Sequence, residues 1–183
     1  MARPERGTIR FGILAAIVTS LAFANLPAGA QATAPKLDDP TIVAIFDAAN
    51  TYDVETGSLA AKKARSKAVR EFGSMIARDH RSVRTQGRDL AKALNVTPTP
   101  PKDFALARAH ADAMRSLRHL KGAGFDRAFL QHEVAFHNAV IDALNHTLMP
   151  AIQNAQLKDL VVKVAPAFVA HRDRAQNLLD GLK

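Results

Sequence analysis

The stretch at residues 125–148, FDRAFLQHEVAFHNAVIDALNHTL, decides the fold. Its apolar residues recur at steps of three and four, which predicts an amphipathic helix. His137 lies in the middle of the apolar stripe, and Glu133 lies one turn earlier and roughly 40° away. Both side chains are therefore directed to where the protein should be driest. A charged group buried there must be paired, bound to a metal or neutralised.

Three more long amphipathic helices are predicted, at residues 40–64, 67–94 and 155–180. Asp39 is expected to cap the first of them and Asn154 the last, because short polar side chains accept hydrogen bonds from the free N–H groups of a first turn. No segment alternates strictly between apolar and polar residues, so no strand is expected.

A shorter amphipathic segment at residues 103–120 is predicted between the second long helix and the central one. It follows the linker TPTPP at 97–101, which cannot continue a helix, and Gly122 and Gly124 separate it from the central helix. Four long helices with short connections predict an all-α, antiparallel four-helix bundle with an extra helical segment before the third helix. That segment is expected either to extend the third long helix or to cover one end of the bundle.

Residues 1–32 are expected to be a cleaved signal peptide. Three arginines precede an apolar run at 11–26, and small residues offer cleavage after Ala30 or Ala32. The alternative is a membrane anchor that stays attached, but the run is short for a spanning helix and ends in a cleavage site. We therefore expect a periplasmic or secreted protein.

The mature chain is expected to comprise a mobile N-terminal tail at residues 33–39 and one domain at 40–183. It contains no Cys, so the fold must be held by packing alone. The net charge falls from +8 to +6 without the signal peptide, which favours only weak contact with an anionic envelope surface. One Tyr and no Trp leave little to stack on bases, so we expect no nucleic-acid partner.

Polar residues on the other helices could join the pair on the central helix. His80 and His171 lie on the apolar stripes of the second and last helices, whereas Asp53 and Glu55 flank the stripe of the first. All lie near the middle of their helices, so they could meet at one depth. The candidate metal ligands are thus His80, Glu133, His137, His171, Asp53 and Glu55.

Neutral imidazoles with one or two carboxylates suit Fe, Mn, Zn or Cu, and the set does not select among these metals. The same residues could instead form a buried hydrogen-bond network that specifies helix pairing. Of the remaining histidines, His132 and His146 are expected to face solvent and His119 to point away from the helix stripe. His110 is expected to be packed, with a smaller chance of lining the site.

Short motifs follow one another in a fixed order: Asp53-x-Glu55-x-Gly57-x-Leu59-Ala60, Met75-x-x-x-Asp79-His80, Phe125-Asp126-x-x-Phe129, His137 and Pro166-x-x-x-x-His171. Over residues 40–182 this pattern resembles the exported bacterial proteins called domain of unknown function 4142, which are often labelled predicted outer-membrane proteins. The resemblance implies a ferritin-like bundle and an exported location, and it supplies no established activity.

The chain departs from the di-iron members of the ferritin-like class. Those bundles use Glu-x-x-His on two helices and a Glu from each of the other two. No Glu-x-x-His occurs here, and Glu133 and His137 are four residues apart. With too few carboxylates to bridge two irons, a single ion is the better expectation.

The leading hypothesis is therefore an exported ferritin-like protein of unknown cellular role that binds one transition-metal ion. One alternative is a non-catalytic envelope module, structural or interacting, with a buried His/Glu hydrogen-bond network. Another is a surface-binding protein that acts through basic residues of the first two helices: Lys62, Lys63, Arg65, Lys67 and Arg70. The sequence identifies no reaction and favours a role other than an enzyme.

Overall fold

The computed structural model describes residues 37–182, and within that range the chain forms helices and no strand. The helices are α1 (Asp39–Lys63), α2 (Lys67–Ala93), α3 (Ala105–His119), α4 (Gly122–Ala143), the π-helical turn η1 (Leu144–Leu148), α5 (Met149–Ala151) and α6 (Ala155–Asp180). The all-helical prediction is confirmed. The predicted signal peptide and residues 33–36 of the predicted tail lie outside the described range.

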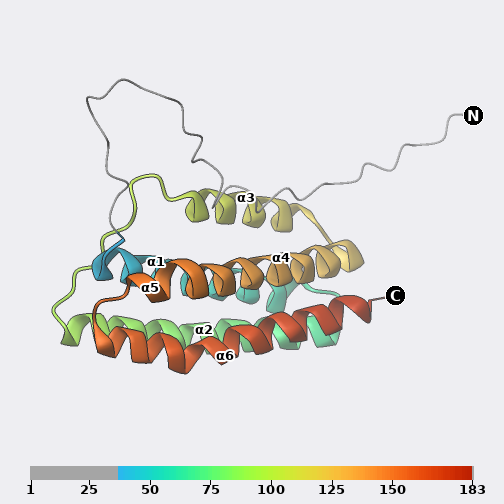
Figure 1. Cartoon of the computed structure of the whole chain (residues 1–183). Coiled ribbons are helices and arrows are strands. Elements are labelled where there is room, and N and C mark those ends of the chain that lie inside the picture. Colours follow the sequence, from blue (N-terminus) through green and yellow to red (C-terminus); the bar gives the residue numbers. More distant parts are fainter. Residues whose placement is uncertain (1–36, 183) are drawn as a thin grey trace, which may run out of the picture.

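Four long helices lie side by side. Helix α1 packs along α2, and α4 packs along α6, while α2 also contacts α6 and α1 contacts α4. These four pairings close a ring, in which neighbouring helices run antiparallel (Figure 1). Helix α3 packs on the outer side of α1 and α4, away from α2 and α6 (Figure 1). The extra segment therefore covers one side of the long helices and does not extend the third of them.

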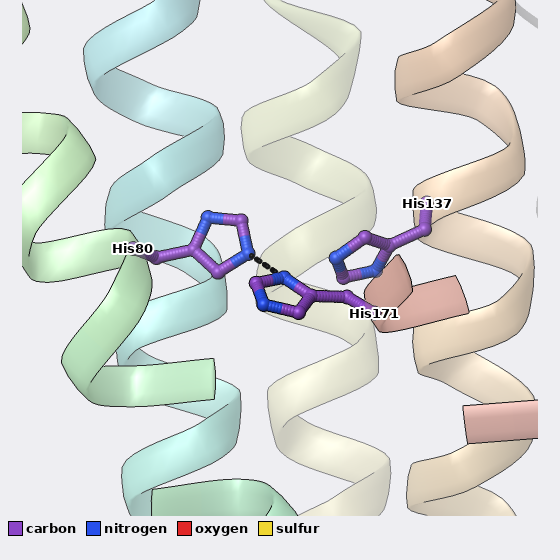
Figure 2. Close-up of side chains that lie close together, drawn as sticks. All are labelled: His80, His137 and His171. Atoms are coloured by element: carbon purple, nitrogen blue, oxygen red, sulfur yellow. Dashed lines mark hydrogen bonds between the residues drawn. The ribbon is translucent and has the colours of Figure 1, made fainter. Parts of the chain in front are cut away.

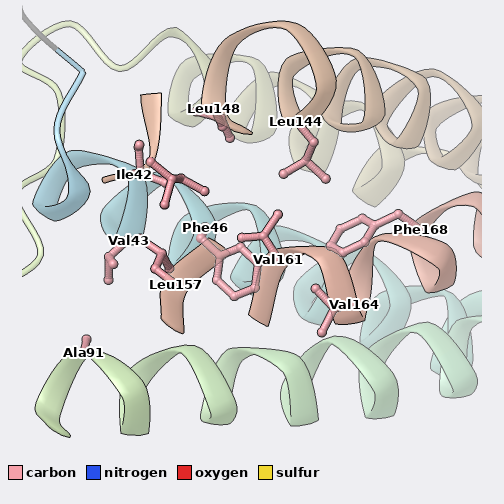
Figure 3. Packing of buried hydrophobic residues seen from close by; sticks show 11 residues of the cluster. Ile42, Val43, Phe46, Ala91, Leu144, Leu148, Leu157, Val161, Val164 and Phe168 are labelled. Atoms are coloured by element: carbon pink, nitrogen blue, oxygen red, sulfur yellow. The ribbon is translucent and has the colours of Figure 1, made fainter. Parts of the chain in front are cut away.

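Apolar side chains form two separate clusters along the helices. The first core cluster lies at the end where α1 and α6 begin, and it includes Ile42, Phe46, Leu148, Val161 and Phe168 (Figure 3). The second core cluster lies toward the opposite end and includes Phe72, Phe125, Phe129, Leu130 and Ala175. Each long helix carries at least one buried polar residue between the two clusters.

The helix starts are capped much as the sequence predicts. Asn154 caps α6 by accepting a hydrogen bond from Leu157 N at 3.1 Å. The cap of α1 is Asp38 rather than the predicted Asp39, because the helix starts one residue earlier. Asp39 instead accepts hydrogen bonds from the backbone N–H groups of Gln153 and Asn154, both at 2.9 Å. This carboxylate ties the start of α1 to the start of α6.

The central helix differs from its prediction at both ends. It begins at Gly122, whose φ of +57° suits glycine, and Gly124 lies within its first turn instead of interrupting it. At the other end α4 stops at Ala143, and the chain continues as a π-helical turn through residues 144–148. The expected single helix is thus an α-helix followed by a wider, π-helical turn.

Helices α1 and α2 approach closely at two facing glycines. A Cβ added to Gly57 would lie 2.7 Å from the Gly73 carbonyl oxygen, and a Cβ added to Gly73 would lie 2.7 Å from the Gly57 carbonyl oxygen. Both obstacles are backbone atoms, which cannot turn aside as a flexible side chain does. The close contact therefore requires glycine at both positions, and it sets the distance between the two helices that carry Asp53 and His80.

No helix within residues 37–182 combines the length and the apolar character needed to cross a membrane.

Substituting Gly73→Ala should lower the free energy of unfolding by about 1–3 kcal/mol, because the added methyl group forces α1 and α2 apart. Urea denaturation measures the change. Gly124→Ala is the matched control, since nothing lies within 4 Å of its added Cβ and alanine is the better helix former. Equal stability of the two variants would contradict the close contact.

Candidate metal centre

Each of the four long helices contributes a buried polar side chain to one cluster. Asp53 comes from α1, His80 from α2, Glu133 and His137 from α4, and His171 from α6. The first four are at most 1% exposed and His171 is 6% exposed. One ring nitrogen from each histidine lies within 4.8 Å of the others, and so do one atom each of Asp53, Glu133 and His137. Figure 2 shows the three imidazoles pointing toward one another. We call these five residues the polar cluster.

The rings of His80 and His137 are each held by a hydrogen bond through Nδ1. His80 Nδ1 donates to Asn50 Oδ1 at 2.9 Å, and the Asn50 amide is itself oriented by donating to Phe46 O at 2.8 Å. His137 Nδ1 donates to the backbone oxygen of Glu133 at 3.0 Å. A neutral imidazole with its proton on Nδ1 carries a lone pair on Nε2. Both histidines therefore present a free Nε2 lone pair.

His171 is held from the outside in the same way. Its Nε2 lies 3.3 Å from Oδ2 of Asp79, a half-buried carboxylate on α2. When Nε2 donates to that carboxylate, Nδ1 carries the lone pair. His171 Nδ1 lies 3.1 Å from His80 Nε2 (Figure 2), which is a hydrogen bond when the His171 proton is on Nδ1, whereas two lone pairs face each other when it is on Nε2. Only a proton or a cation between these nitrogens makes the contact favourable.

Four more acceptor atoms of the polar cluster are buried without a hydrogen-bond donor. They are both carboxylate oxygens of Asp53, Oε2 of Glu133 and Nε2 of His137. Asp53 Oδ2 lies 3.3 Å from His80 Nδ1, but the proton of that nitrogen is directed to Asn50. The other oxygen of Glu133, Oε1, accepts from Thr56 Oγ1 at 2.8 Å. A proton retained by Asp53 or Glu133 can serve as the donor between these two carboxyls, whereas His137 Nε2 has no donor, and a cation among the four atoms would satisfy them all.

Burial controls the protonation of the cluster. Desolvation, reinforced by the neighbouring histidines, lowers the pKa of His80 to about 2 and that of His137 to about 3. Desolvation also lowers the pKa of His171, although hydrogen bonding to Asp79 opposes the shift. The imidazoles are therefore neutral at physiological pH, which is the form that binds metals.

The two carboxyl groups show the opposite effect. Desolvation raises the pKa of both Asp53 and Glu133, and their closeness to each other raises that of Asp53 further. In the metal-free protein the pair therefore retains a proton at pH values where ordinary carboxyls have lost it. A bound cation would displace this proton and leave two anionic ligands.

The donor set fits a single transition-metal ion. Ligand nitrogens at about 2.1 Å from an ion, with bond angles of 90–109°, lie about 3.0–3.4 Å apart. The separation of 3.1 Å between His80 Nε2 and His171 Nδ1 falls in this range. Each of the three histidines also has its outer N–H bonded to an oxygen, as metal-binding histidines almost always do. The buried groups could thus hold a metal ion.

Glu55 is not brought to the polar cluster. Its carboxylate is half exposed and accepts a hydrogen bond from His110 Nε2 at 2.8 Å. The His110 ring stacks on Tyr52, with the ring centroids 4.1 Å apart. His110 is packed as predicted, but it binds Glu55 away from the cluster. Glu55 points elsewhere because it lies two residues from Asp53 on α1, roughly 200° around the helix.

The prediction that His132 faces solvent is wrong. Its side chain is buried and its ring packs against Phe136. Desolvation and, as the smaller cause, nearby His110 lower the pKa of His132 to about 4. Helix α3 covers this face of α4, and a single-helix projection has no means of including a neighbouring helix. His146 and His119 are exposed, as predicted.

Three supporting residues were not predicted: Asn50, Thr56 and Asp79. Asn50 and Thr56 lie three residues before and after Asp53, on the same face of α1, so that spacing was a usable signal. Asp79, next to His80 on α2, reaches across to His171 on α6. Only the pairing of α2 with α6 could reveal that contact.

Comparison with known protein families shows the family of the chain. It belongs to the family described as Domain of unknown function (DUF4142), whose model matches residues 24–178. The resemblance drawn from the sequence motifs is thereby confirmed. No curated protein and no solved structure matches the chain.

The free energy of unfolding of the metal-free protein should fall as the pH rises from 7 to 8, by about 1 kcal/mol for a buried carboxyl that loses its proton in the folded state. The folded state holds the Glu133 carboxyl proton up to about pH 8, whereas in the unfolded state that carboxyl is ionised throughout this window. Unfolded histidines are mostly neutral above pH 7, so they contribute little.

Chemical denaturation in the presence of a chelator measures this slope. Glu133→Gln should reduce it, because the variant removes one titrating carboxyl and also the charged neighbour that raises the pKa of Asp53. The control Asp142→Asn alters an exposed carboxylate and should keep the full slope. A Glu133→Gln slope equal to that of the unaltered protein would show that this carboxyl is ionised in the fold.

Proposed function

We propose that this DUF4142 protein is an exported, ferritin-like four-helix bundle that binds a single transition-metal ion between its two apolar core clusters. The observation that carries the proposal is the convergence of three neutral imidazoles from three helices, each with its outer N–H already bonded. Closed rings of antiparallel helices commonly build metal sites from inward side chains on facing helices.

His80, His137 and His171 are the primary ligands in this proposal, and Glu133 and Asp53 complete the coordination. Glu133 Oε1 stays bonded to Thr56, which leaves Oε2 free for the ion. Both Asp53 oxygens are free, so this residue can bind through one or two atoms. Imidazole with carboxylate suits Zn, Fe, Mn or Cu, and the proposal names the site without choosing among them.

A second candidate is supported by the hydrogen bonds themselves. Asp79, His171, His80 and Asn50 form a chain of contacts that joins α2, α6 and α1. As a purely structural network, it would specify how the helices pair in a non-catalytic envelope module. The acceptors without a hydrogen-bond partner, above all His137 Nε2, support the metal, since a purely structural network would leave no such atom.

The proposed location is the periplasm or the exterior, supported by the basic and apolar character of residues 1–32. Contact with an anionic envelope surface would be weak, because part of the basic group is engaged. Lys63 Nζ donates to the backbone oxygens of Leu117 and Arg118, and Arg70 donates to those of Ala64 and Arg65. The proposal includes no reaction and no nucleic-acid partner.

The metal content of protein purified without a histidine tag should be near one ion per chain. After chelation, adding Zn, Mn, Fe or Cu singly should raise the melting temperature with at least one of them, because only the folded state assembles the ligands. His171→Ala should abolish that rise, and His146→Ala, which alters an exposed histidine, should retain it.

The network alternative gives a different result in the same experiment. His171→Ala would then lower the melting temperature, and no metal would shift the melt of either protein. A metal-dependent rise that persists in His171→Ala but disappears in His146→Ala would place binding at the surface.

A further inference from the structure

An apolar cavity of about 280 Å³ lies beside the polar cluster. It is enclosed by α1, the start of α3, α4 and η1, with Phe168 of α6 at its inner side. Phe104 and Leu106, at the start of α3, line it from the outer side, and both residues are half buried. The cavity exists because small side chains, including Ala139 and Ala143 of α4, face it from the long helices.

The lining restricts what the cavity can hold. None of its side chains is charged, and only Asn50 and Thr147 are polar. Thr147 is exposed and Asn50 is fully buried, so the cavity extends from the surface to the interior. Both side-chain groups of Asn50 are engaged, the oxygen with His80 and the nitrogen with Phe46 O. An anion would find no counter-charge there, and burying it would carry a large desolvation cost.

The inner end of the cavity is shared with the polar cluster. Asn50 holds His80 through the 2.9 Å hydrogen bond, and the Phe168 ring packs edge-on to His80 at 5.1 Å between centroids. Phe168 also contacts His137, at 6.0 Å between centroids. A molecule that fills the cavity therefore touches the two side chains that position the His80 ring.

We propose that this cavity binds a neutral, largely apolar small molecule whose inner end lies against Asn50 and Phe168, beside the polar cluster. An apolar cavity of about 150 Å³ is large enough to bind benzene, so this one accommodates roughly nine to twelve non-hydrogen atoms. The proposal places a small molecule of a defined chemical class beside the candidate metal centre. The inference that a small molecule binds in the cavity is based on the cavity lining alone. The inference that this molecule affects a bound metal ion rests on the proposed function.

Two ligands of equal chain length test the charge requirement. 1-Octanol and octanoate are titrated by calorimetry into protein purified from cells that express the full sequence. Octanol should bind at least tenfold more tightly than octanoate, because the lining cannot compensate a carboxylate. Equal or tighter binding of octanoate would overturn the proposal and point to fatty-acid or acyl-chain recognition.

Variants that fill the cavity test its location. Ala139→Leu should weaken octanol binding at least tenfold, and Ala143→Leu serves as a second variant in case the first does not fold. Ala165→Leu is the matched control, because it enlarges an alanine in a different groove, on the outer side of α4 and α6. Octanol binding that is unchanged in both cavity variants, or lost only in Ala165→Leu, would overturn the assignment.

The cobalt(II) form separates this inference from the proposed metal site. Octanol should change the visible spectrum of bound cobalt, since it contacts the residues that hold His80. His171→Ala should lose cobalt and keep octanol binding, whereas Ala139→Leu should keep cobalt and lose octanol binding. Octanol binding without any cobalt site would refute the metal centre alone, and cobalt binding without octanol binding would refute the cavity proposal alone.

Discussion

The structure depends on burying five ionisable side chains at one level between two apolar clusters. Asp53, His80, Glu133, His137 and His171 are almost completely removed from water, and burial in such surroundings is costly unless each polar atom has a partner. The outward ring nitrogens of the three histidines have such partners, namely oxygens of Asn50, Asp79 and the Glu133 backbone. On the inner side of the cluster, the remaining ring nitrogens and the carboxyl oxygens converge. A single cation would suit all of them, which is the basis of the proposed metal site.

The proposed metal binding would be linked to folding. No single helix carries enough ligands to hold an ion, so the site forms only when all four long helices are in register. The Gly57–Gly73 contact fixes the approach of α1 to α2, and the Asp39 carboxylate ties the starts of α1 and α6 together. Binding energy at the polar cluster is therefore also folding energy.

Much of the fold and most of the site follow from single-helix patterns. Helical periodicity located the long helices, and a central position on an apolar stripe identified His80, His137 and His171. The same reasoning failed where a second helix decides the outcome. His132 is buried because α3 covers it, and Asp79 reaches His171 because α2 lies beside α6. Asp53 and Glu55 flank the apolar stripe on opposite sides, and packing places Asp53 in the core and Glu55 against His110.

X-ray absorption at the metal edge of protein loaded with one equivalent of zinc tests the central claim most directly. The account predicts a shell of nitrogen and oxygen atoms at about 2.0–2.2 Å, with the multiple scattering of three imidazole rings. Loss of one ring in His171→Ala would assign that ligand. A shell of oxygen atoms without imidazole scattering would contradict the account, because it would place the ion away from His80, His137 and His171.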